Sequence, residues 1–301
     1  MTQPRIYAST DVEVTGKTRV FGIIGDPVSH SLSPLFQARF AAQRGIDAAY
    51  VPLRVASGQV AAALDGLWAA NIQGFNVTVP HKETVAGMVE KDSAAQLIGA
   101  VNTVRRGVDG WQGTNTDWQG VRDALRALGS RLEGAEVLLI GAGGTARAVL
   151  HALAGEAVRR VSICNRSAER LQALISHAAD AYPDLEVREL AWEKHAVEGH
   201  ARQCSVVINT TSIGLGETMV EFPFAIAGEG VALDAVYVED GRTPFVVAAC
   251  RDGRRAADGL SMLLAQGAAS FAWWHGMQVD VPPVMNWIEE RLGRCRADRL
   301  Q

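Results

Sequence analysis

The hydrophobic pattern of the chain is clearest at residues 137–140, where four apolar residues follow one another without a polar interruption. Such a run is typical of a parallel strand that is buried on both faces. A glycine-rich turn follows, and the next apolar residues recur at helical spacing. Comparable strand-like runs at 160–164, 204–212 and 230–237 alternate with helical segments. This alternation predicts a doubly wound parallel sheet.

A second series of β/α units precedes this region of the chain. Ser33-Pro34 predicts a helix start with Ser33 as the N-cap, and Asp109-Gly110 predicts a hairpin turn. An apolar stripe over residues 259–274 predicts a helix packed in the core. The pattern predicts strands at 20–25, 48–55, 72–79, 99–104 and 111–114, and helices at 34–44, 58–69 and 118–128 with a further one ending near 98.

The expected fold class is therefore α/β, with two domains and a cleft between them. Residues 19–118 form the first α/β domain, joined by C-terminal helices within 259–301, and residues 119–258 form a Rossmann-type domain. Residues 1–18 are polar and mixed, which is typical of a flexible extension. A length of 301 residues is comfortable for two domains.

Composition narrows the possible partners. The hydrophobic content of 48% and charged content of 21% describe an ordinary globular protein. A net charge of -4 without a basic cluster argues against nucleic-acid binding, and no apolar run is long enough for a membrane span or a secretory signal. The scattered cysteines Cys164, Cys204, Cys250 and Cys295 suit a reducing compartment, so we expect a cytoplasmic protein without a metal site.

The turn after residues 137–140 has the form G-x-G-x-x-A. Gly141 allows a tight turn, Gly143 lets the backbone approach a pyrophosphate, and Ala146 lets the helix pack close to the strand. The free N–H groups at the start of this helix favour phosphate. Glycine-rich turns also occur for packing reasons, so the motif alone leaves that alternative open.

The end of the next strand favours NADP over NAD. NAD-binding chains place an acidic residue there, against the ribose 2′-hydroxyl. This chain has Asn165-Arg166-Ser167 and then Arg170, and guanidinium groups suit a 2′-phosphate. The alternative is that both arginines merely cover a solvated helix start.

Polar motifs also mark the N-terminal domain. Ser31 and Ser33 flank a helix entrance, where their hydroxyls could together hold a carboxylate. Thr78 and Lys82 follow a predicted strand, at the edge where open α/β sheets bind ligands. Asn115-Thr116-Asp117 opens the helix that is expected to cross between the domains.

These motifs, in this order, resemble the shikimate dehydrogenase family. The resemblance covers residues 20 to about 276. It implies NADP-dependent interconversion of 3-dehydroshikimate and shikimate, in aromatic amino-acid biosynthesis, by a monomer or homodimer whose partners are small molecules. The segments that carry the resemblance are 30–34, 76–82, 99–103, 115–117, 141–146, 165–167, 208–212 and 259–266.

The resemblance also implies roles for single residues. Lys82 and Asp117 form the catalytic pair, and Ser31 and Ser33 bind the substrate carboxylate. The residues implied to contact the ring hydroxyls are Thr78, Asn102, Asp117, Tyr237 and Gln266. The residues implied to bind the cofactor are Gly141, Ala142, Gly143, Gly144, Thr145, Ala146, Asn165, Arg166, Ser167, Arg170, Thr210, Ala235 and Gly259.

The residue types agree with ketone reduction. Negative charge develops on the ketone oxygen, where an ammonium group stabilises it and can deliver the proton. A nearby carboxylate fixes the position and charge state of that ammonium. Alone, Lys82 would more often be a surface lysine, Asp117 a helix N-cap and Gln266 a solvated side chain.

Several positions depart from the family pattern and leave the substrate open. Trp118 follows Asp117 where the family usually has glycine, so that bulk is expected beside the catalytic carboxylate. Other departures are Phe36-Gln37, Leu215 and residues 238–240. The alternatives are a quinate/shikimate or shikimate-like dehydrogenase acting on another hydroaromatic acid, and a non-catalytic sensor of NADP and such an acid.

Overall fold

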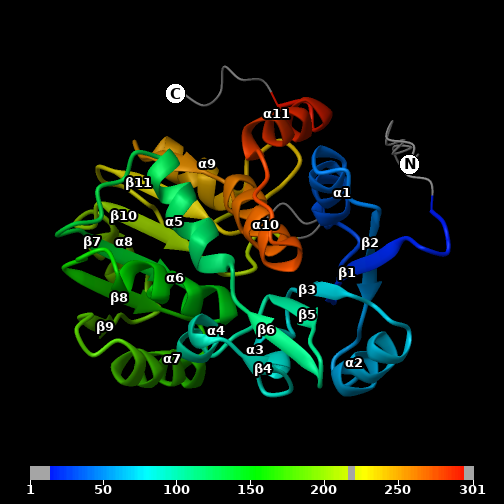
Figure 1. Ribbon diagram of the computed structural model, residues 1–301. Helices are drawn as coiled ribbons and strands as arrows, with labels where there is room; N and C mark the ends of the chain where they lie inside the picture. The colour runs from blue at the N-terminus through cyan, green and yellow to red at the C-terminus, as the bar shows by residue number, and fades with distance from the viewer. Residues whose placement is uncertain (1–13, 216–220, 295–301) are drawn as a thin grey trace.

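The computed structural model describes residues 14–215 and 221–294. Cys295 and most of the predicted N-terminal extension lie outside these ranges. The described residues form two sheets of six strands each, one in each half of the molecule (Figure 1). The predicted two-domain α/β fold is confirmed.

The C-terminal sheet is entirely parallel and has the strand order β12-β11-β10-β7-β8-β9. This is the doubly wound order of a Rossmann fold, with a switch point between β7 and β10. Its strands are β7 (Glu136–Ile140), β8 (Arg160–Cys164), β9 (Val187–Glu189), β10 (Val206–Asn209), β11 (Val231–Asp234) and β12 (Arg255–Ala257). Its helices are α6 (Gly144–Ala154), α7 (Ala168–Ala181), α8 (Lys194–Ala201) and α9 (Pro244–Arg251).

The N-terminal sheet is mixed, in the order β2-β1-β3-β5-β6-β4. The predicted hairpin is confirmed, since β5 and β6 pair antiparallel. The strands are β1 (Arg19–Gly25), β2 (Ala48–Arg54), β3 (Gly74–Val77), β4 (Glu90–Lys91), β5 (Thr103–Arg106) and β6 (Trp111–Thr114). The helices are α1 (Ser33–Gln43), α2 (Val60–Ala69), α3 (Lys82–Ala86) and α4 (Ser93–Ile98). The helix α5 (Asp117–Ala127) follows β6 and packs against the C-terminal sheet.

The two remaining helices, α10 (Leu260–His275) and α11 (Val281–Arg291), return to the N-terminal half. The helix α10 packs against α1 and α5, and Figure 1 shows it (orange) between them. None of the helices in the described ranges combines the length and apolar character needed to cross a bilayer.

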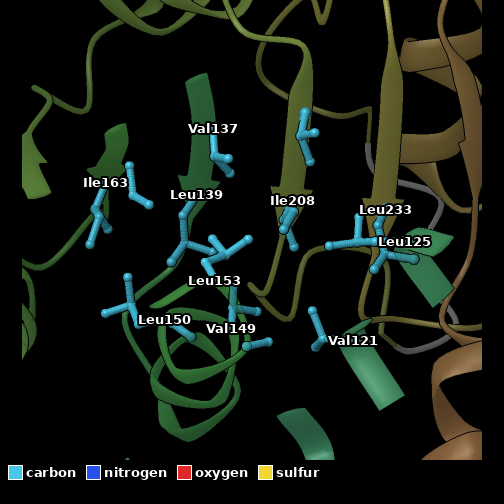
Figure 2. Close-up of a cluster of buried hydrophobic side chains, with 14 of the residues drawn as sticks. Val121, Leu125, Val137, Leu139, Val149, Leu150, Leu153, Ile163, Ile208 and Leu233 are labelled. Carbon is cyan, nitrogen blue, oxygen red and sulfur yellow. The ribbon is translucent and has the colours of Figure 1, made fainter. Parts of the chain in front are cut away.

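The C-terminal domain has a hydrophobic core on each face of its sheet, one against α5, α6 and α7 and the other against α8 and α9. Leu139 and Ile208 project from neighbouring strands toward Val149 and Leu153 of α6 (Figure 2). All four side chains are buried. The apolar run at 137–140 is fully buried, as its lack of polar residues predicts.

Three local predictions need correction. Ser33 is not the N-cap of α1: that position is Leu32, and Ser33 is the first helical residue. The strand predicted at 99–104 begins at Thr103, because Gly99 (φ +69°) ends α4 in a left-handed conformation. The strand predicted at 204–212 ends at Asn209, after which the chain turns along the cleft described below.

Candidate active site

A cleft of about 650 Å³ separates the two sheets and is lined from both domains. It runs along the carboxyl ends of the parallel strands of the C-terminal sheet, where open α/β sheets bind ligands. The residues predicted for the site that line it are Ser31, Ser33, Thr78, Lys82, Asn102, Asp117, Gly141, Ala142, Gly143, Thr145, Asn165, Arg166, Ser167, Arg170, Thr210, Ala235, Tyr237, Gly259 and Gln266.

The proposed catalytic pair is formed. Lys82 Nζ donates a hydrogen bond of 2.6 Å to Asp117 Oδ2, and the side chains are only 13% and 5% exposed. Lys82 is the first residue of α3 and Asp117 the first residue of α5, so both stand at fixed helix starts. Partial burial strengthens their attraction relative to a surface pair, because water screens it less. Both residues line the cleft.

Asn102 holds the other carboxylate oxygen of Asp117. Its Nδ2 donates to Asp117 Oδ1 at 2.8 Å and to Gln266 Oε1 at 3.2 Å. Its Oδ1 accepts from the Thr116 amide at 2.8 Å, and Asn115 Oδ1 accepts from the Asp117 amide at 2.9 Å. The alternative that Gln266 is solvated is wrong, because it is buried and bonded to Asn102.

Ser31 and Ser33 also line the cleft, at the start of α1. Ser31 Oγ accepts from the Ser33 amide at 3.2 Å, so the two residues form a compact turn at the start of α1. Tyr237 reaches this turn from the C-terminal domain: its hydroxyl donates to the His30 carbonyl at 3.3 Å and accepts from the Leu32 amide at 3.4 Å. Burial raises the pKa of Tyr237, which keeps its hydroxyl protonated.

The glycine-rich turn has the geometry expected of a phosphate site. Gly141 has φ +114°, and a Cβ there would lie 2.4 Å from Thr210 Oγ1. A Cβ on Gly143 would meet nothing within 4 Å, so space for a ligand remains over the start of α6. No side chain caps the N-terminus of α6, which leaves its amides available to an anion.

Two residues predicted to bind the cofactor do not line the cleft. Ala146 is fully buried in the core, where its small side chain allows close helix packing. Gly144 faces the other domain: a Cβ there would lie 3.2 Å from the Cβ of Lys82. The glycine therefore lets α6 approach Lys82 closely.

The far end of the cleft is basic and exposed. Ser167 Oγ accepts from the Arg170 amide at 3.4 Å and caps α7. Arg166 and Arg170 are exposed cleft residues, and within the described ranges neither guanidinium is paired with a carboxylate. Both therefore remain available to a phosphate group.

Trp118 does not crowd the cleft, contrary to the expectation from sequence. Its ring meets the His151 ring edge-on, with centroids 5.3 Å apart, and packs against Ala100 and Ala148. It is absent from the cleft lining because successive residues of a helix point in different directions. The bulk therefore lies between α4 and α6 and outside the cleft lining.

Sequence reasoning missed several residues of the cleft, among them Asn76, Met262 and Trp192. Asn76 Nδ2 donates to the Asn102 carbonyl at 3.1 Å and so helps to fix the backbone of that residue. Trp192 follows the short strand β9. A position just after a parallel strand could have indicated from sequence that Trp192 lies at the ligand-binding edge of the sheet.

Comparison with known proteins agrees with this geometry. The model of the shikimate dehydrogenase substrate binding domain matches residues 23–104, that of shikimate/quinate 5-dehydrogenase matches 123–214, and that of the shikimate 5′-dehydrogenase C-terminal domain matches 259–286. A shikimate dehydrogenase (NADP(+)) of Geobacter metallireducens is 37% identical over 89% of this chain and 94% of its own length. The chain belongs to the shikimate dehydrogenase family.

Solved members of the shikimate dehydrogenase family share the fold. The enzyme of Aquifex aeolicus superposes with a TM-score of 0.80 at 34% identity, covering 94% of this chain and 100% of the other. The enzyme of Thermus thermophilus, solved with NADP(H) and shikimate, superposes with a TM-score of 0.77 at 32% identity, covering 91% and 100%. The resemblance inferred from the motifs is confirmed at the level of the family.

Proposed function

We propose that this chain is an NADP-dependent shikimate dehydrogenase, an oxidoreductase that interconverts 3-dehydroshikimate and shikimate. The observation that carries the proposal is the Lys82–Asp117 pair, bonded at 2.6 Å inside a cleft that also contains a phosphate-binding turn. The curated relatives with this name support the substrate.

Lys82 and Asp117 handle the proton of the reaction. During reduction, the ammonium of Lys82 stabilises the negative charge that develops on the ketone oxygen and delivers a proton to it. During oxidation, the same amine takes the hydroxyl proton. Asp117 holds Lys82 in place through its Oδ2, while the bond from Asn102 to its Oδ1 fixes the carboxylate itself.

The substrate is held at both ends. The hydroxyls of Ser31 and Ser33 bind its carboxylate at the start of α1. Asp117 and four polar cleft residues contact the ring hydroxyls: Thr78, Asn102, Tyr237 and Gln266.

NADP fits the remaining part of the cleft. The amides at the start of α6 bind the pyrophosphate over Gly143, and Asn165, Ser167 and the two arginines hold the 2′-phosphate end. The nicotinamide supplies or accepts the hydride when it is bound. The two arginines are Arg166 and Arg170, and the other cofactor contacts that we propose are Gly141, Ala142, Thr145, Thr210, Ala235 and Gly259.

The proposal also covers the division of the chain into domains and its cellular location. We assign residues 19–118 and the helices from 259 onward to the substrate domain, and residues 119–258 to the NADP domain. The described cysteines are free thiols, which suits a reducing compartment, so we place the protein in the cytoplasm as a monomer or homodimer.

Steady-state oxidation of shikimate and of quinate, each with NADP and with NAD, tests the proposal. Shikimate with NADP should be turned over with the highest kcat/KM. Lys82→Met should lower kcat by about 10²–10⁴-fold while the NADP Kd is unchanged. Lys91→Met is a matched control, because Lys91 is partly buried against the Ala86 carbonyl and outside the cleft.

The possible outcomes separate the alternatives. Faster turnover of quinate would make the chain a quinate/shikimate dehydrogenase. NADP binding without turnover of either acid would favour the sensor. Near-normal turnover by Lys82→Met would show that the proton is handled elsewhere.

A further inference from the structure

An aromatic side chain stands at the basic end of the cleft. Trp192 lies between β9 and the N-cap of α8, just after Leu190, whose amide donates to the Ile163 carbonyl at 2.8 Å. Because β7, β8 and β9 are parallel, the loops after them lie at the same edge of the sheet. Trp192 therefore lies on the same edge as the glycine-rich turn and Arg166.

The Trp192 ring is anchored from behind by other aromatic rings. It meets the Phe224 ring edge-on, with centroids 4.8 Å apart and an interplanar angle of 76°. Phe224 contacts Phe222 at 5.9 Å, and Phe222 contacts Phe245 at 5.0 Å. These three phenylalanines are buried, whereas Trp192 is partly exposed and lines the cleft. Little conformational freedom is therefore left for the indole to lose when a ligand binds.

The position of Trp192 distinguishes it from the other aromatic side chain of the cleft. Among the described residues, Tyr237 and Trp192 are the Tyr, Trp or Phe side chains that line it. Tyr237 contacts His30 and Leu32 at the substrate end. The buried side of Trp192 packs on Phe224 and its apolar cluster, and its exposed part lines a cleft whose wall also includes Arg166 and Arg170. An aromatic face exposed there suits a flat aromatic group of a ligand.

We propose that Trp192 is the surface on which the adenine of NADP stacks. This inference rests on the proposed role of the cleft in binding NADP. Stacking on an aromatic ring recognises the face of the base and is independent of the 2′-phosphate. Cofactor affinity then has two separate sources: Trp192 acts on the adenine, and Arg166 with Arg170 acts on the phosphate.

The two sources are separable by calorimetry on the whole protein. Dissociation constants for NADP, NAD and 2′,5′-ADP are measured for the wild type, Trp192→Ala, Trp192→Phe and Arg166→Gln. Trp192→Ala should weaken all three ligands by the same factor of about ten, because all three contain adenine. Arg166→Gln should weaken NADP and 2′,5′-ADP but leave NAD unchanged.

Kinetics with shikimate and NADP provide the second measurement. Trp192→Ala should raise the KM for NADP while kcat at saturating NADP and the KM for shikimate stay at wild-type values. Trp192→Phe should keep most of the affinity, since it keeps a π-face, and remains informative if the alanine variant does not fold. Trp273→Ala is the control, because Trp273 packs on Arg105 outside the cleft.

Unchanged affinity of Trp192→Ala for 2′,5′-ADP would overturn the proposal. So would a loss for NADP and 2′,5′-ADP with NAD unchanged, because the ring would then act through the 2′-phosphate that only these two ligands carry. A wild-type protein that binds NADP without oxidising shikimate would refute the proposed function and leave this inference standing, so the two failures are distinguishable.

Discussion

Gly141 and Gly143 of the glycine-rich turn are predicted to respond differently to alanine. At Gly141 (φ +114°), a Cβ would lie 2.4 Å from Thr210 Oγ1 and 3.0 Å from the Thr210 carbonyl carbon. The positive φ costs about 1–3 kcal/mol, and moving the Thr210 hydroxyl away from the Ile140 carbonyl costs about 1 kcal/mol more. Gly141→Ala should therefore lower the free energy of unfolding by about 3 kcal/mol.

Gly143 has the opposite character. Its backbone (φ -103°, ψ -171°) is open to any residue, and a Cβ there would meet nothing within 4 Å. Alanine should leave stability unchanged or raise it by about 0.5 kcal/mol. Because Gly143 lines the cleft over the start of α6, the added methyl should occupy the space of the pyrophosphate and weaken NADP binding about tenfold or more.

Thermal unfolding and NADP calorimetry on both variants check this pair. Gly141→Ala should melt roughly 6–12 °C below the wild type, and Gly143→Ala should melt with the wild type and bind NADP poorly. Wild-type NADP affinity in Gly143→Ala would refute the phosphate role of the turn. Wild-type stability in Gly141→Ala would refute the steric argument.

Two further predictions concern residues outside the catalytic pair. Burial raises the pKa of Asp234 to about 7. Between about pH 4 and 7, the folded chain therefore holds a proton that the unfolded chain has released. The free energy of unfolding should fall as pH rises through this window. Asp234→Asn should flatten this fall in pH-dependent melting curves; an unchanged slope would assign it to other groups. Trp118→Ala should lower stability by about 2 kcal/mol and leave kcat/KM for shikimate unchanged, because the ring packs between α4 and α6. A loss of kcat/KM at unchanged stability would contradict that placement.

The order and type of the main elements followed from sequence because they depend on local signals. The uninterrupted apolar run at 137–140 and the strand-like run at 160–164 became β7 and β8. The tight turn predicted at Gly141 lies between β7 and α6, where this glycine has a positive φ. Element ends were less accurate. Ser33 has the residue type of an N-cap, yet the N-cap of α1 is Leu32, and Ser33 is the first residue of the helix, where it is buried.

The sequence by itself determined the fold class, the family and the residue types of the site, because periodicity, turn glycines and short motifs are properties of neighbouring residues. Only the tertiary structure decided which distant residues meet. The Lys82–Asp117 bond and the bonds from Asn102 to Asp117 and Gln266 join four separate parts of the chain. The directions of Trp118 and Trp192 were likewise decided by packing, since the sequence shows that an indole is present but not which neighbours surround it.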